Sequence, residues 1–332
     1  REYLVYLLSQ DPALKIVGTA KNGLEGVEQA ERLKPHLILM DVHMPQMNGF
    51  EATREIMSRC PTPIVMVSAS MSKDEAALSF EALKAGALML VDKPAGPDHP
   101  EYPETSRRLV EAVKLMAEVK VIRHYSKRQR RSAEPTPVCI GDQKIHIIAI
   151  GASAGGPPVL ADILERLPRE FALPILVVQH IAAGFVAGLV DWLRHQTRLT
   201  VKLAERGERV TPGTVYIAPD TLQMGLTKRG TIHLTTEAAD DGFRPSVSYL
   251  FRSVAESFGP SAVGVLLTGM GRDGAEGLLR LREAGAITIA QNQETSAVFG
   301  MPAEAIRLGA AEHVLSPEQI VGAIRSLVGR GR

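Results

Sequence analysis

Short aliphatic strands alternate with helical segments along most of this chain, and that alternation restricts the chain to parallel α/β folds. Parallel strands need a long crossover between them, which a helix usually supplies. In the first part of the chain, β-type runs at 16–19, 37–40, 64–68 and 89–91 alternate with helical stretches near 24–33, 50–57 and 75–85. The pattern predicts a first parallel-sheet domain over residues 1–94.

The same alternation resumes at Lys144 and continues almost to the end of the chain. Its β-type runs are 145–150, 175–179, 214–218, 262–267 and 287–290, and its helical segments are 158–167, 185–195, 246–257, 275–284 and 317–328. Two further runs, 222–226 and 231–235, are close enough in sequence to pair as a hairpin. We therefore expect a second domain over residues 144–330, built on a doubly wound parallel sheet.

The stretch between the two patterns, residues 95–143, has the composition of a linker. It opens with the proline-rich AGPDHPEYPE, continues as a helical segment near 105–125, and then carries the basic run KRQRRS. A linker of about 45 residues is long enough to have a function of its own. The basic run would also suit a DNA-binding output domain, but the strand–helix alternation that follows is unlike a helix-turn-helix module. We interpret the run as a solvated tether.

Charge, hydropathy and cysteine content exclude several classes of protein. The formal net charge is +1, so no global field favours nucleic acid as a partner. The longest apolar runs fall far short of the roughly 20 residues of a membrane helix, and we expect no membrane insertion. The two cysteines, Cys60 and Cys139, are far apart and form no metal-binding pair. A reducing cytoplasmic location fits this usage of cysteine.

Three polar residues follow predicted strands of the first domain. Asp41 comes directly after the aliphatic run LILM, Ser68 ends the next strand, and Lys93 follows the last one. Ligands of open α/β sheets sit at the carboxyl ends of the strands. A carboxylate there can accept a phosphoryl group, while a hydroxyl and a lysine can contact the added charge. By itself, Asp41 would more often be a turn residue or a helix cap.

The second domain opens with a strand that runs directly into GASAGGPP. Residues 151–155 fit G-x-S-x-G, the elbow that presents a nucleophilic serine, here Ser153, at a strand-to-helix turn. Backbone N–H groups at the following helix terminus can stabilise an oxyanion. A purely structural turn and a dinucleotide-binding loop are the alternatives. The loop is disfavoured because Ser153 replaces the middle glycine of G-x-G-x-x-G and because no acidic residue ends the next strand.

A serine nucleophile needs a base and an acid that orients the base. His180 ends the next strand and should lie at the same sheet edge, whereas His195, within a helix, and His233, in the hairpin, are weaker candidates. Asp273 follows the buried run 262–267 in a glycine-rich turn. The chain order Ser, His, Asp differs from the Ser, Asp, His order of α/β-hydrolases, so we expect a different fold.

The segment DVHMPQMNG, the strand end at Ser68 and the Lys93-Pro94 pair resemble the receiver family of two-component systems over residues 1–94. The resemblance implies a flavodoxin-like fold in which Asp41 takes phosphate from a sensor histidine kinase, with Ser68 as switch hydroxyl and Lys93 as phosphate contact. It also implies Mg²⁺ for phosphorylation. Leu90 replaces the aromatic switch residue that is usual in receivers, which puts signal relay through that position in doubt.

The first strand of a receiver, with its acidic pair for Mg²⁺, has no counterpart in this sequence. The chain starts at Arg1 inside what resembles the first helix of the family, so we expect the first domain to be truncated. Without the acidic pair, Asp41 would be the only carboxylate of the magnesium site. One carboxylate with water is a poor site for Mg²⁺, and we assign no metal ligands with confidence.

The segments IGASAGGP, VVQH, YIAPD, RPSVSYLF, LTGMGRDGA and FGMP resemble the catalytic domain of the chemotaxis protein-glutamate methylesterase family. That resemblance implies a triad of Ser153, His180 and Asp273, with the backbone of Ala154 and Met270 as oxyanion donors. The substrates implied are methylated glutamates, and glutamines for deamidation, on methyl-accepting chemoreceptors. It implies no cofactor for the hydrolysis. We also expect the receiver to inhibit the hydrolase until Asp41 is phosphorylated.

Overall fold

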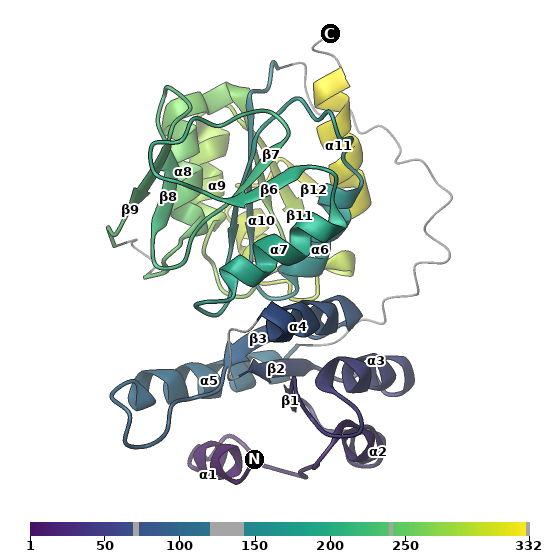
Figure 1. Cartoon of the computed structure of the whole chain (residues 1–332). Helices are drawn as coiled ribbons and strands as arrows, with labels where there is room; N and C mark the ends of the chain where they lie inside the picture. Colours follow the sequence, from purple (N-terminus) through teal and green to yellow (C-terminus); the bar gives the residue numbers. More distant parts are fainter. Residues whose placement is uncertain (69–72, 120–142, 239–241, 330–332) are drawn as a thin grey trace. The chain divides into compact units, whose positions relative to one another are not determined.

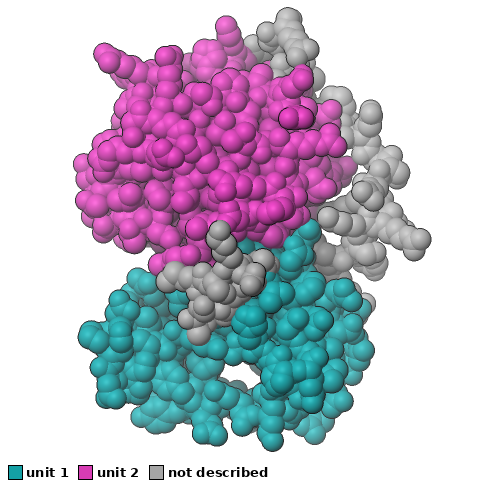
Figure 2. Space-filling model, in the orientation of Figure 1, with its two compact units in different colours: residues 1–125 teal, residues 126–332 magenta. Residues whose placement is uncertain are grey.

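The computed structural model describes residues 1–68, 73–119, 143–238 and 242–329. The chain divides into two compact units, Arg1–Tyr125 and Ser126–Arg332, which are coloured separately in Figure 2. Both units are α/β, and parallel pairing dominates their sheets, as the alternating pattern predicts. Among the helices of the described ranges, none is both long and apolar enough to cross a membrane.

The first unit contains a parallel sheet in the order β1-β2-β3. Its strands are β1 (Ile38–Asp41), β2 (Ile64–Ser68) and β3 (Met89–Asp92), and its helices are α1 (Glu2–Ser9), α2 (Gly23–Leu33), α3 (Gly49–Arg59), α4 (Lys73–Ala85) and α5 (Tyr102–Ala117). Every residue of β2 is buried, as expected for the central strand of a covered parallel sheet. The register of the three strands places their carboxyl ends at one edge of the sheet. The candidate site residues of this unit lie at or just after those ends.

The strand expected at 16–19 does not form. These residues have no regular secondary structure, and within the described chain β1 pairs with β2 alone. The side chain of Ile16 instead packs against a cluster that contains Leu7, Leu8 and Leu109. An extended segment becomes a strand only when a neighbouring backbone supplies hydrogen bonds. Here Ile16 finds apolar contacts while Val17 stays exposed, and among the described residues the backbone has no partner strand.

Helix α5 belongs to the first unit, so the expected boundary at residue 94 is too early. Its residues Leu109 and Val113 are buried together with Leu7 and Leu8 of α1. This packing explains why α5, which lies within the expected linker 95–143, belongs to the first unit. The helix itself was predicted, near 105–125, but it was assigned to the linker because a proline-rich stretch precedes it. The basic run of the linker lies outside the described residues.

The second unit is built on a seven-stranded parallel sheet in the order β12-β11-β10-β4-β5-β7-β6. The strands are β4 (Ile147–Ala152), β5 (Ile175–Gln179), β6 (Thr200–Leu203), β7 (Thr214–Ile217), β10 (Ala262–Leu266), β11 (Ile287–Gln291) and β12 (His313–Leu315). The chain starts at β4 in the middle, winds outward through β5, and later returns to β10 on the other side of β4. The chain adds strands on one side of β4 first and on the other side later, so the direction of winding reverses between β4 and β10. Ligands bind at such a reversal in open α/β sheets.

Helices cover both faces of this sheet (Figure 1). One layer holds α6 (Gly156–Glu165), α7 (Val186–Gln196) and α11 (Pro317–Gly329), and the other holds α8 (Val247–Phe258), α9 (Ala275–Glu283) and α10 (Met301–Arg307). The expected hairpin is confirmed as the antiparallel pair β8 (Gln223–Leu226) and β9 (Ile232–Thr235). Strands β6 and β12 and helix α10 were not predicted, because each is too short to show a clear period.

The position of α5 leads to a stability prediction with a control on the same helix. Leu109 is 1% exposed and Leu115 is 42% exposed. Truncating a buried leucine leaves a cavity, so Leu109→Ala should lower the free energy of unfolding of the first unit by about 2–5 kcal/mol. Leu115→Ala should change it by less than about 0.5 kcal/mol. Urea unfolding with hydrogen exchange on α5 measures both, and equal effects would contradict the assignment of α5 to this unit.

Candidate active site and phosphoacceptor site

Ser153 lies on a sharp turn between β4 and α6. Strand β4 is buried along its whole length and delivers the serine to the carboxyl edge of the sheet. The backbone N–H of Ser153 donates to the carbonyl of Thr268 at 3.0 Å, which ties the turn to the loop after β10. Gly155 has φ of +73°, and a Cβ there would lie 2.5 Å from Cβ of Ala297. Only glycine allows this tight return into the helix.

His180 occupies the matching position on the neighbouring strand. Ala152 and Gln179 are partners in the β4–β5 register, so the next residues, Ser153 and His180, leave adjacent strands at the same edge. The side chain of Gln179, which is 3% exposed, reinforces this pairing. Its Nε2 atom donates to the carbonyl oxygens of Ser153 and of His180, each at 2.8 Å. One buried amide therefore holds the backbone of both residues.

Asp273 is almost fully buried and is held at the N-terminus of α8. Its Oδ2 atom accepts from Val247 N at 2.8 Å, and its Oδ1 atom accepts from Ser248 N at 2.8 Å and from Ser246 Oγ at 3.0 Å. Free N–H groups and the positive end of the helix dipole both stabilise a carboxylate at this place. The interpretation of Asp273 as a simple turn residue does not account for these contacts.

His180 and Asp273 meet across the sheet edge. Nε2 of His180 lies 2.9 Å from Oδ2 of Asp273, while the ring N–H is out of line for a hydrogen bond. The contact is therefore close but not an aligned hydrogen bond, and such geometry often tightens only when substrate binds. The other ring nitrogen is left for a proton from the nucleophile. One face of the imidazole is covered by the ring of Phe243, with the centroids 4.6 Å apart.

The predicted oxyanion donors come from two loops: Ala154 follows Ser153 in the turn after β4, and Met270 lies on the loop after β10. Among the described residues, the backbone N–H groups of Ala154 and Met270 donate to no protein atom. The loop after β10 lies against the nucleophile, since a Cβ added to Gly269 would be 2.8 Å from Cβ of Ser153. Two unused donors beside a serine are the requirement for stabilising a tetrahedral oxyanion.

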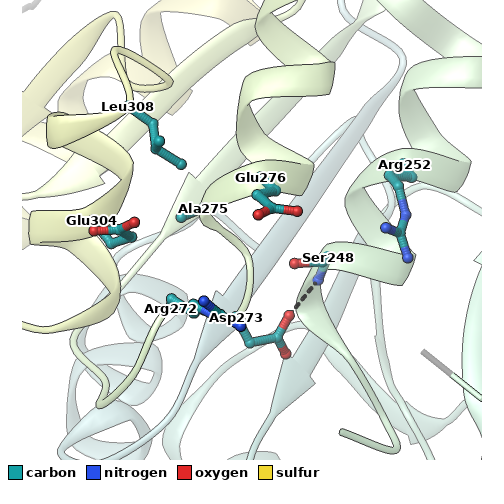
Figure 3. Close-up of a pocket in the computed structure, with 8 residues that line it drawn as sticks. All are labelled: Ser248, Arg252, Arg272, Asp273, Ala275, Glu276, Glu304 and Leu308. Atoms are coloured by element: carbon teal, nitrogen blue, oxygen red, sulfur yellow. Dashed lines mark hydrogen bonds between the residues drawn. The ribbon is translucent and has the colours of Figure 1, made fainter. Parts of the chain in front are cut away.

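A pocket borders Asp273 on the side of α8, α9 and α10 (Figure 3). Ser153 and His180 are not among its lining residues, so the pocket adjoins Asp273 but does not surround the candidate nucleophile. The Arg307 guanidinium hydrogen-bonds to Glu304 at its rim and lowers the pKa of that carboxyl. The pocket is lined by Ser248, Arg252, Arg272, Asp273, Ala275, Glu276, Glu304 and Leu308.

Asp220 anchors the loop that follows His180. It comes after β7, the strand next to β5, and its Oδ2 atom accepts from Gly184 N at 2.7 Å. Burial raises the pKa of this carboxyl, and the hydrogen bond from Gly184 opposes the shift only in part. The ionised carboxylate is therefore less favourable at this position in the folded chain than in the unfolded chain.

In the first unit, the structure brings the three predicted residues to one sheet edge. Asp41 ends β1, Ser68 ends β2, and the backbone N–H of Lys93 donates to the carbonyl of Ser68 at 2.7 Å. Nζ of Lys93 lies 2.6 Å from Oδ2 of Asp41, and Oδ1 of Asp41 is buried without a hydrogen-bond partner among the described residues. Leu90 is buried within β3. A carboxylate with one oxygen paired and the other unpaired is suited to accept a phosphoryl group.

The same edge does not provide the ligands that Mg²⁺ requires. Within the described residues, no group of three or more His, Cys, Asp and Glu side chains is placed to hold a metal ion. Asp41 brings one open carboxylate oxygen, and Lys93 places a positive charge beside the other. Mg²⁺ binds through several oxygen ligands in a near-octahedral arrangement. This set of donors does not fit the ion.

The fold and the two candidate sites define a class: an α/β unit with a Ser-His-Asp arrangement at its sheet edge, preceded by an α/β unit in which Asp41 and Lys93 pair at a strand edge. Residues 148–324 match the CheB methylesterase family, and residues 1–100 match the response regulator receiver domain. The chain belongs to the CheB methylesterase family.

Relatives and a solved structure agree with this assignment. A protein-glutamate methylesterase/protein-glutamine glutaminase of Geobacter metallireducens is 49% identical over 98% of this chain and 95% of its own length. One of Nitrosospira multiformis is 48% identical over 99% of this chain and 94% of its own. The crystal structure of the Thermotoga maritima CheB methylesterase catalytic domain is 39% identical, with a TM-score of 0.53, over 56% of this chain and 98% of that chain.

Sequence reasoning missed the residues that hold the triad in place. The segment around Ser246 carried a family resemblance, but its hydrogen bonds to Asp273 were not foreseen. Its signal was a serine directly before a helical pattern, which is typical of a helix N-cap. Gln179 stands directly before His180 at the end of a predicted strand, and a polar amide at the end of an aliphatic strand is the available hint. No sequence signal indicates that Phe243 stacks on His180.

The raised pKa of Asp220 gives a prediction about pH and stability. Its folded pKa lies above the unfolded value of about 3.9, so stability falls as the pH rises through the window between them. Asp220→Asn removes the ionised form and keeps an oxygen that can accept from Gly184. The variant should melt at a higher temperature than the parent at pH 7, and the difference should shrink at acidic pH. Melting curves at the two pH values measure this; a lower melting temperature for the variant at pH 7 would contradict it.

Proposed function

We propose that Ser153, His180 and Asp273 hydrolyse glutamate γ-methyl esters on methyl-accepting chemoreceptors and release methanol. The observation that supports this most directly is the convergence of the three side chains at one sheet edge, with His180 Nε2 2.9 Å from Asp273. Family membership supplies the reaction class, and relatives over nearly the whole chain are named methylesterase and glutaminase. The second activity proposed is deamidation of receptor glutamines at the same serine.

The proposed mechanism assigns one task to each group. Ser153 Oγ attacks the γ-carbonyl carbon while His180 takes its proton, and the ion pair with Asp273 stabilises the imidazolium. The N–H groups of Ala154 and Met270 receive the negative charge of the carbonyl oxygen. The C–O bond to the methoxy group then breaks, and His180 gives the proton to the departing methoxy oxygen, which leaves as methanol. Water attacks the glutamyl ester by the same route and releases glutamate with free Ser153.

Deamidation follows the same steps with a different leaving group. When the substrate is glutamine, the C–N bond of the tetrahedral intermediate breaks and His180 protonates the departing ammonia. The glutamyl ester on Ser153 is identical in the two reactions, so the second half of the cycle is shared. No cofactor takes part in this proposal.

The receiver unit regulates this activity in our proposal. A sensor histidine kinase supplies the phosphoryl group: Asp41 Oδ1, which has no hydrogen-bond partner among the described residues, attacks phosphorus while the P–N bond to the kinase's phosphohistidine breaks and the imidazole leaves. Lys93 is already 2.6 Å from the other oxygen and contacts the added charge. Phosphorylation shifts a balance between a less active and a more active form of the chain.

The hydrolytic proposal is tested by methanol release from membranes that contain methylated chemoreceptor. The parent chain should release methanol, and Ser153→Ala should lower the rate by at least about 10³-fold because it removes the nucleophile. Ser261→Ala is the matched control, since Ser261 lies just before β10, at the opposite edge of the sheet. Equal release by the parent and the Ser153→Ala variant would remove Ser153 from the mechanism.

The regulatory proposal is tested with a small phosphodonor, acetyl phosphate. It should raise methanol release by the parent about 5–150-fold, the range of a typical coupling free energy. Asp41→Asn removes the acceptor oxygen and should abolish the increase. Asp98→Asn, an exposed aspartate of the same unit, should respond like the parent. An undiminished response of the Asp41→Asn variant would show that Asp41 is not the acceptor.

A further inference from the structure

The side chain of Phe243 is exposed to solvent and also contacts His180. It is one of the large apolar residues on the surface, with 44% of its area exposed. Its ring also stacks on the imidazole of His180, with 4.6 Å between centroids and 9° between the ring planes. Exposure of a phenylalanine gains nothing for folding. The position of the ring therefore calls for an explanation within the site.

The backbone of Phe243 is fixed by a buried amide. Gln223 of β8 is fully buried, and its Nε2 atom donates to the carbonyl of Phe243 at 2.8 Å. Its Oε1 atom accepts from Ser246 N at 2.8 Å. The two bonds clamp the segment 243–246 from one side. The exposed ring thus stands on an anchored stretch of chain.

The same segment also leads to the acid of the triad. Ser246, which the amide of Gln223 holds, donates from Oγ to Asp273. Asp273 contacts the edge of the His180 ring, and Phe243 contacts its face. The edge and the face of one imidazole are therefore supported from a single short segment.

The contact with Asp273 does not by itself fix the imidazole plane. The ring N–H is out of line with the carboxylate, so this contact restrains rotation of the ring about its bond to Cβ less than an aligned hydrogen bond would. Face-to-face packing restricts that rotation, because turning the imidazole would drive its edge into the phenyl ring. We propose that Phe243 is a positioning residue that sets the plane of His180 for proton transfer with Ser153. This inference rests on the proposed role of His180.

The expected effect follows from the strength of such contacts. An aromatic pair contributes about 0.5–1.5 kcal/mol beyond its buried area, and about 1.4 kcal/mol corresponds to a tenfold change in rate. Phe243→Ala should lower kcat for methanol release about tenfold and leave KM within about twofold. Phe243→Tyr keeps the ring and should stay within about twofold of the parent in both constants. Phe243→Leu keeps apolar bulk without a flat face and should resemble Phe243→Ala.

Nuclear magnetic resonance on the full chain tests the stack without any substrate. A proton over the face of a phenyl ring is shielded, so the His180 ring protons should resonate upfield of an unstacked imidazole. Their signals are assigned by their loss in His180→Gln. The upfield shift should persist in Phe243→Tyr and vanish in Phe243→Ala and Phe243→Leu. Val314→Ala, which truncates another exposed apolar residue of this unit, should leave both the shift and kcat unchanged.

The outcomes separate this inference from the proposed function. Loss of the shift together with a kcat loss that Phe243→Tyr does not show supports positioning. A raised KM with unchanged kcat would identify Phe243 as a substrate contact and overturn the inference. Parent-like kcat in Phe243→Leu or Phe243→Ala would overturn it as well. If the parent chain releases no methanol, the proposed function fails, whereas a parent spectrum without the upfield shift refutes the stack itself.

Discussion

The buried carboxylate of Asp273 is the constraint on which the hydrolase unit depends. A charge that is 1% exposed is costly unless donors surround it, and the N-terminus of α8 supplies two backbone N–H groups and the hydroxyl of Ser246. This requirement fixes where α8 begins. Ser248 Oγ in turn accepts from Gly274 N at 2.7 Å, so the loop that carries Asp273 is bound to the same helix. The orienting acid is held rigidly before it contacts His180.

The topology of the sheet brings Ser153, His180 and Asp273, the proposed nucleophile, base and acid, to one edge. Because β4 is central, β5 on one side delivers His180 and β10 on the other leads to Asp273, while β4 itself ends at Ser153. Hydrogen bonds between the loops then fix the positions of these residues, which the strand order alone sets only approximately. Gln179 joins the backbones of Ser153 and His180, and Thr268 Oγ1 donates to the carbonyl of Ala154 at 3.0 Å. The oxyanion donors are therefore held by the same contacts that shape the elbow.

The two units use one structural principle for different chemistry. In each, polar residues follow buried parallel strands, and the sheet edge gathers them from distant parts of the sequence. In the first unit the result is a single carboxylate paired with Lys93. In the second unit the carboxylate is enclosed by hydrogen bonds and serves a histidine instead of reacting. In the proposed function, burial and hydrogen-bond partners thus decide whether an aspartate at a strand end accepts a phosphoryl group or orients a histidine.

The sequence alone determined the α/β class, most strands and helices of both units, and the residues at the strand ends. These are local properties, because hydrophobic period and glycine-rich turns are encoded within short windows. Only the tertiary structure decided that 16–19 lacks a partner strand, that α5 completes the first unit, and that Phe243 covers His180. Each of these depends on contacts between segments far apart in the chain, such as α1 with α5 or the segment after β9 with the end of β5. Pairing and packing over such separations leave no periodic signal in either segment by itself.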